Sequence, residues 1–159
     1  MGRAFVTIGF GMLVALAGCG GGGGAGAGEP LVSGTLSGQY KNQPFTPTTG
    51  IATLYMGQNL IGFGDGPVNC ASPQQPNPPA GTMAYFTLPT LDLTTHSSVF
   101  VQMIQNKGSF DGIGSNAGTV TLTAVSAASV AGNVSYSYTD STTNFNYGIS
   151  GDFEVTRCP

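Results

Sequence analysis

The chain has 159 residues, enough for one domain, and only 7% of them are Asp, Glu, Lys or Arg. Soluble domains usually carry about 25% charged residues, so the polarity of this chain comes mainly from Ser, Thr, Asn and Gln. The formal net charge is −3, and a sparse negative balance offers no basic surface to a nucleic acid. Composition therefore argues against nucleic-acid binding and favours pleated, half-buried strands.

Residues 1–18 have the order of an export signal. Arg3 and the α-amine supply positive charge, and residues 4–16 form an apolar stretch interrupted only by Thr7. A membrane-spanning helix needs about 20 apolar residues, so this stretch is too short for a permanent anchor but suits a signal peptide. We predict that residues 1–18 are a signal peptide.

The run Leu16-Ala17-Gly18-Cys19 resembles the lipobox of bacterial lipoproteins. The resemblance implies that the Cys19 thiol receives a diacylglycerol, that cleavage precedes it, and that a fatty acid such as palmitate acylates the new amine. The membrane is then a partner, held through the lipid on Cys19. Gly20, rather than Asp, follows the cysteine, which in enterobacterial lipoproteins favours the outer membrane. The expected location is the cell envelope, with the domain facing the periplasm or the surface.

An ordinary secretory signal, with no role for Cys19, is the alternative to the lipobox. Residues 20–28 comprise seven glycines and two alanines, which leave nothing to bury and predict a linker with a root-mean-square span of about 17 Å. The predicted organisation is a lipidated cysteine and tether over residues 19–29, followed by a single all-β domain over residues 30–159.

From Pro30 onward, apolar and polar residues alternate with a period of two between turn signals, and no stretch has convincing helical spacing. Gly57-Gln58-Asn59 is expected to form a hairpin turn, and residues 124–131 a hairpin connection. The final strand is expected to be long and kinked at Gly148 or Gly151, with one phase formed by Phe145, Tyr147, Ile149, Gly151, Phe153 and Val155. The strands expected from this pattern lie near residues 32–40, 51–56, 60–63, 83–88, 99–104, 119–123, 134–139 and 145–155.

About eight strands without crossover helices predict an all-β fold, either an antiparallel β-sandwich or a closed up-and-down barrel. The sandwich is the first choice, because strand lengths are uneven and a Pro-rich loop, residues 71–81, interrupts the middle. Proline lacks a backbone donor, so this loop is expected on the surface. The last forty or so residues, with a final strand leading to Cys158, resemble small uncharacterised bacterial lipoproteins with β-sandwich domains.

Cys70 and Cys158 remain as an even pair if Cys19 is lipidated and the domain lies in an oxidising compartment. We predict a disulfide between them, which would stabilise the fold by about 4–5 kcal/mol in the chain-entropy model. The alternative is two free thiols, one of them catalytic. A nucleophilic cysteine would need a nearby histidine or cation, and the chain's one histidine, His96, lies in a Thr/Ser-rich turn.

Other catalytic and metal-binding patterns are weak in this chain. No Gly-x-Ser-x-Gly elbow accompanies His96, and a single histidine excludes the usual zinc sets. Residues 112–117 match a dinucleotide-binding pattern, but a strand follows them, so the glycines are expected to form a loop. Four carboxylates would bind calcium only if loops brought them together, and Asp in turns needs no ion: Asp65, Asp111, Asp152 and Glu154.

We therefore expect no enzyme activity, no catalytic residues, no metal site and no cofactor. The leading hypothesis is an envelope-anchored lipoprotein whose domain has a non-catalytic binding or structural role, with a protein or glycan partner that the sequence does not identify. One alternative is a barrel that carries a small apolar ligand, which requires an interior cavity of several hundred Å³. Another is a hydrolase of envelope polymers, which requires the carboxylates to converge in a cleft.

Overall fold

The computed structural model describes residues 32–66, 68, 70, 81–106 and 110–159, and the predicted signal peptide, Cys19, the tether and residues 71–80 of the Pro-rich loop lie outside these. Within this part of the chain every regular element is a strand, which confirms the all-β prediction. The strands are β1 (Val32–Gly34), β2 (Ser37–Tyr40), β3 (Gln43–Phe45), β4 (Thr49–Tyr55), β5 (Gln58–Gly64), β6 (Thr82–Leu88), β7 (Thr95–Asn106), β8 (Phe110–Val125), β9 (Ser129–Thr139) and β10 (Asn146–Arg157).

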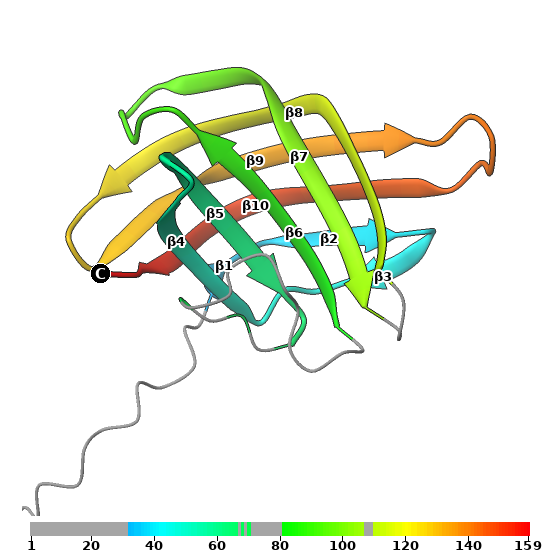
Figure 1. Ribbon diagram of the computed structural model, residues 1–159, viewed down its shortest axis with the longest axis horizontal. Coiled ribbons are helices and arrows are strands. Elements are labelled where there is room, and N and C mark those ends of the chain that lie inside the picture. The colour runs from blue at the N-terminus through cyan, green and yellow to red at the C-terminus, as the bar shows by residue number, and fades with distance from the viewer. Residues whose placement is uncertain (1–31, 67, 69, 71–80, 107–109) are drawn as a thin grey trace, which may run out of the picture.

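Strands β4 to β10 form a closed barrel (Figure 1). Each of these strands pairs antiparallel with the next, and β10 closes the ring by pairing parallel with β4. β2 and β1 pair in succession with the same edge of β10 that reaches β4, and β3 pairs with β2. Of the two predicted architectures, the chain adopts the closed barrel and not the sandwich.

The uneven strand lengths, which had favoured the sandwich in the sequence analysis, are compatible with a closed barrel. β8 has 16 residues and β7 and β10 have 12 each, and these long strands pair with both of their neighbours around the ring. A register shift in β7 coincides with Ser98, whose φ is 56°, and marks a bulge of the kind that bends a strand. Long, bent strands let the sheet curl until its edges meet.

Two tight hairpins need a backbone with positive φ. Lys41 and Asn42 have φ of 51° and 65° between β2 and β3, and Met56 and Gly57 have φ of 49° and 77° between β4 and β5. Two-residue turns with both φ values positive match the twist of the adjoining strands. The second turn is therefore Met56-Gly57, one residue earlier than the Gly57-Gln58-Asn59 turn expected from the sequence, and Gln58 already belongs to β5.

The final strand is a single long element, as predicted. Tyr147, Ile149, Phe153 and Val155 are all buried on one face, which confirms their common phase. Gly151 has a φ of 125°, and a Cβ atom there would lie 2.7 Å from the carbonyl oxygen of Thr35. Between the two positions considered, Gly151 is therefore the one whose backbone requires glycine.

The glycines of residues 112–117 lie within β8 and do not form the loop that the sequence suggested. Gly114 lies beneath the ring of Phe100 on β7, because a Cβ atom at Gly114 would be 2.5 Å from the Phe100 Cζ atom. A glycine in a strand permits such close approach of a neighbouring side chain. Residues 126–128 connect β8 and β9, so the hairpin connection predicted over residues 124–131 is present but shorter, because its two ends belong to the strands.

Apolar side chains fill the inside of the barrel, and a second apolar cluster lies on its outer wall. The interior contains the aromatic group Phe63, Phe86 and Phe153, with ring centroids 5.1–6.3 Å apart. The outer cluster lies over β4 to β7 and consists of Ile51, Leu60, Val68, Met83, Tyr85, Ile104 and Cys158. β4, β5 and β6 are thus buried on both faces, which explains their nearly continuous apolar sequences.

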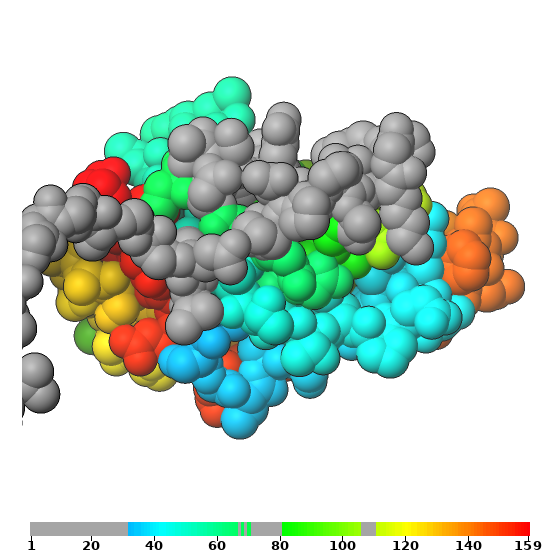
Figure 2. All heavy atoms as spheres, turned by 90° about the horizontal axis from the view of Figure 1, so that it is seen from below, coloured from blue at the N-terminus to red at the C-terminus, as the bar shows by residue number. Residues whose placement is uncertain are grey.

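The barrel has two distinct ends. The C-terminal end contains the β4–β5 turn, the β6–β7 connection, the β8–β9 turn and the C-terminus, and β1 begins near it, where Val32 pairs with Val155. The opposite end contains the β2–β3 and β9–β10 turns (Figure 1). In the space-filling view, the β9–β10 turn (orange) projects at one extremity and the C-terminal residues (red) lie toward the other (Figure 2).

Candidate functional site

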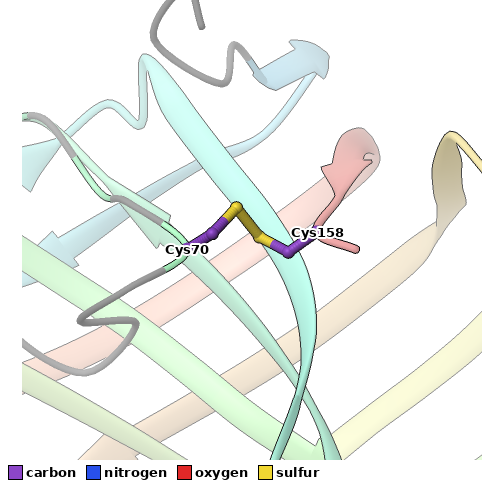
Figure 3. Close-up of a disulfide and its surroundings, with 2 residues drawn as sticks. All are labelled: Cys70 and Cys158. Atoms are coloured by element: carbon purple, nitrogen blue, oxygen red, sulfur yellow. A yellow bond between two sulfur atoms is a disulfide. The ribbon is translucent and has the colours of Figure 1, made fainter.

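Cys70 and Cys158 form a disulfide, in agreement with the pairing expected from the sequence (Figure 3). Their Cα atoms are 5.7 Å apart, within the ordinary range for a disulfide. Cys158 is buried in the outer cluster, whereas Cys70 is exposed in the segment after β5. The bond therefore attaches that segment to the end of β10, over the outer wall of β4 (Figure 3).

The four carboxylates considered as ligands or catalytic groups lie apart, and three of them have separate partners. Asp65 accepts a hydrogen bond from the Thr82 backbone N–H at 2.7 Å, and Asp111 pairs with Lys41. Asp152 accepts from the Asn133 side chain at 3.0 Å, and Glu154 lines a hollow on the outer surface beside β1. In the part of the chain that the structure describes, no three His, Cys, Asp or Glu side chains gather as a metal site.

His96 contacts a carboxylate and a threonine hydroxyl close to it in the sequence. Its Nε2 atom lies 3.2 Å from Asp92 Oδ1 and 3.5 Å from Thr94 Oγ1, at the start of β7. Asp92 also accepts hydrogen bonds from Thr90 and Thr94, and these hydrogen bonds lower the pKa of the Asp92 carboxyl. This short network ties together the connection between β6 and β7, which is a structural role.

A charged pair and aromatic rings lie together at the opposite end of the barrel. The Tyr40 hydroxyl donates to the Asp111 carbonyl oxygen at 3.0 Å, and the Lys41 ammonium pairs with the Asp111 carboxylate. The Lys41 Nζ atom lies 5.7 Å from the Phe145 ring centroid and 5.9 Å from that of Tyr40. These contacts join the β2–β3 turn to the start of β8. Because the pair is partly exposed, we expect it to stabilise this end of the folded barrel by at most about 1 kcal/mol.

Four tyrosines in the barrel have a raised pKa, chiefly because burial takes their hydroxyls out of water: Tyr40, Tyr85, Tyr136 and Tyr147. In the unfolded chain these groups ionise near the ordinary value of 10.0. The folded protein keeps its protons to higher pH, so the unfolded state binds fewer protons above that value. The free energy of unfolding is therefore expected to fall as the pH rises above about 10.

Urea midpoints between pH 8 and 11, followed by circular dichroism, measure this loss. Absorbance at 295 nm should show that the buried tyrosines ionise together with unfolding and not before it. Tyr136→Phe is the matched control, because phenylalanine does not titrate and the pH dependence should become shallower. A midpoint that stays constant to pH 11, or a Tyr136→Phe slope identical to that of the wild type, would contradict the assignment.

A groove on the outer wall is lined by described residues. It has a volume of about 380 Å³ and crosses β2, β10 and β9. Gly38 and Gly148 carry no side chains there, so backbone forms part of the floor. The wall consists of hydroxyl, amide and apolar groups and carries no charge, with lining residues Ser37, Gln39, Asn42, Pro44, Ser137 and Ser150.

Sequence reasoning did not identify this groove. Its lining comes from three segments that are far apart in the chain, near residues 37–44, 136–137 and 148–150. The serines at positions 37, 137 and 150 belong to the polar phase of strands whose other phase is buried. Alternation therefore indicated that they face outward, but only the pairing of β2 and β9 with the two edges of β10 places them side by side.

No helix in the described residues is long and apolar enough to cross a membrane. Protein-family models, curated proteins and solved structures were all compared with the chain, and none of them matches.

Proposed function

We propose that this chain is a bacterial lipoprotein, held at the outer membrane through acyl groups on Cys19, whose barrel has a non-catalytic binding or structural role. The proposal for the barrel depends on one observation, which is that buried side chains fill its interior. Side chains from all seven ring strands and from β2 meet there, and Phe63, Phe86 and Val101 are at most 1% exposed. Binding to other molecules is therefore assigned to the outer surface.

The filled interior weighs against the alternative of a carrier for a small apolar ligand. Ligand pockets usually have volumes of about 300–1,000 Å³ and enclose most of the ligand. Here the 380 Å³ groove lies on the outer wall, and hollows of about 190 and 210 Å³ also open on the surface of the barrel. The separate carboxylates likewise give no support to a hydrolase.

The groove on β2, β10 and β9 supports a neutral, polar partner. Serine hydroxyls and the amides of Gln39 and Asn42 can both donate and accept hydrogen bonds, as a glycan or an extended peptide requires. Because no charged side chain lines the groove, the groove is not suited to binding ions. We therefore propose this groove as the recognition surface of the anchored domain.

Metabolic labelling with radioactive palmitate tests the anchor. The full chain, expressed in a bacterial host, is expected to incorporate label and to partition with the membrane fraction. Cys19→Ser is the matched control and should lose both properties, because it removes the thiol that the lipobox resemblance assigns to lipidation. An unlabelled wild type, or a Cys19→Ser variant that is labelled as strongly, would contradict the anchor.

Native mass spectrometry tests the assignment of the barrel. The protein purified in detergent is expected to have the mass of its chain and acyl groups, without a further small molecule retained under native conditions. A stoichiometric apolar ligand, released by denaturation, would instead support the carrier and contradict the proposal that the interior is filled by the protein's own side chains.

A further inference from the structure

We infer that the C-terminal end of the barrel is a membrane-contacting surface, whose exposed apolar side chains enter the interface of the bilayer to which Cys19 is attached. The inference rests on the proposed lipid anchor and extends it to a defined face of the domain. Its core is a group of exposed residues at that end: Leu54, Met56 and Leu93, which are 72%, 86% and 62% exposed.

These side chains project from adjoining turns. Leu54 and Met56 belong to the tip of the β4–β5 hairpin, and Leu93 belongs to the connection between β6 and β7. The Asn59 side chain, opposite Leu54 in the hairpin, donates to the carbonyl oxygens of Leu88 and Pro89, both at 3.3 Å. The hydrogen bonds hold the hairpin against the start of the β6–β7 connection.

The C-terminus completes the same surface. Leu54 and Leu91 line a hollow of about 190 Å³ together with Cys158 and Pro159. In Figure 1, the β4–β5 turn, the β6–β7 connection and the C-terminus lie on the same side of the molecule, away from the β9–β10 turn. Among the described residues, three of the four large apolar side chains that are exposed thus lie at this end, the fourth being Phe100 on the outer wall, and the other end carries the Lys41–Asp111 pair.

The place where the described chain begins favours the membrane as the partner that covers this surface. Val32 pairs with Val155, close to the C-terminal end of β10, so the chain leads from this end of the barrel toward Cys19. The connecting residues 20–31 span at most about 40 Å when fully extended. An acylated Cys19 would therefore keep this end, rather than the opposite one, next to the headgroups at high effective concentration.

Bilayers suit this surface better than a second protein copy does. Leucine and methionine at the tips of turns can each enter the apolar boundary without a complementary shape on the other side. The charged groups at this end are the C-terminal carboxylate, Arg157, which donates to the Ser126 carbonyl oxygen at 2.9 Å, and Asp92, whose carboxylate accepts from Thr90 and Thr94 and lies 3.2 Å from His96. The surface consists of protruding tips around a hollow and is not a flat sheet face, which gives a second copy little area to pack against.

Single tryptophans test the inference, because the chain contains none of its own. Leu54→Trp and Leu93→Trp place a reporter at the proposed surface, and Thr142→Trp, in the exposed β9–β10 turn, is the matched control at the opposite end. The acylated full-length products are reconstituted in phosphatidylcholine vesicles with and without brominated acyl chains. Circular dichroism first establishes that each variant folds.

We expect blue-shifted emission and loss of intensity with brominated lipid for both reporters, and neither effect for Thr142→Trp. If the protein floats with the vesicles but no reporter is quenched, the inference is overturned and the anchor stands. A blue shift without bromine quenching would also overturn it, because another protein copy would then cover the surface. Failure of every variant to float would contradict the proposed anchor, and the membrane-facing assignment with it.

Discussion

Replacing Cys70 and Cys158 together by alanine is expected to lower the free energy of unfolding by about 4–5 kcal/mol. The disulfide joins positions 88 residues apart, so the unfolded chain gains conformational freedom when the bond is lost. A domain of this size usually has a free energy of unfolding of about 5–15 kcal/mol, so the variant should lose much of its stability. Urea unfolding followed by circular dichroism measures the change.

The local structure adds a second expectation about where the barrel opens. β10 and β4 are joined through Thr156–Ile51 and Arg157–Ala52, and the next residue, Cys158, donates its backbone N–H to the Ala52 carbonyl oxygen at 2.7 Å. This parallel seam is far shorter than the pairing of β10 with β9. Without the disulfide, amide hydrogen exchange should therefore accelerate first at Cys158, whose N–H bonds across the seam, and less at Arg157, whose N–H bonds to the Ala128 carbonyl oxygen.

Reduction of the wild-type protein provides the control for this prediction. A reductant should reproduce the loss of stability in the wild type and have no effect on the double alanine variant. Cys19→Ser should leave the urea midpoint unchanged, because the disulfide does not involve that residue. If the wild type unfolds at the same urea concentration with and without reductant, the disulfide does not carry the stability assigned to it.

Much of the barrel could be predicted from local patterns. Alternation in the final strand identified Tyr147, Ile149, Phe153 and Val155 as one buried face, and the even pair of cysteines indicated the disulfide. These features depend on the period of a strand and on an even number of cysteines, which a single sequence carries. Local patterns were therefore sufficient for the buried face of the final strand and for the cross-link.

The choice between sandwich and barrel could not be made in the same way. Both architectures need strands with one buried face, and the difference is whether the first and last strands of the sheet meet. Here closure depends on a parallel pairing of β10 with β4, between positions more than a hundred residues apart. The β8 glycines were misassigned for a related reason, because the Phe100 ring that lies over Gly114 belongs to another strand.

The candidate surfaces were hidden for the same physical reason. Lys41 and Asp111 are separated by 70 residues, and nothing in either local sequence indicates that they pair. Leu54 lies near the end of β4 and Leu93 in the connection before β7, and a single exposed apolar residue is ordinary at either place. Their common position at one end of the barrel becomes visible only when the meander is closed (Figure 1).

Replacing Phe153 with alanine is expected to lower the free energy of unfolding by about 3–5 kcal/mol. Phe153 is 3% exposed, and its ring centroid lies 5.1 Å from that of Phe63 and 6.3 Å from that of Phe86. Removing the ring leaves a cavity among three strands that the barrel cannot collapse to fill, so both the transfer free energy and the packing contacts are lost. The urea midpoint is again the measurement.

Phe100→Ala is the matched control, since it removes the same ring from a strand of the same barrel. Phe100 is 45% exposed on the outer wall, where it covers Gly114, so its loss should cost about 1 kcal/mol or less. If Phe153→Ala abolishes folding, Phe153→Leu should fold with a smaller loss, because leucine fills part of the space. Equal effects of Phe153→Ala and Phe100→Ala would mean that the interior is not the packed core on which the exclusion of an internal ligand depends.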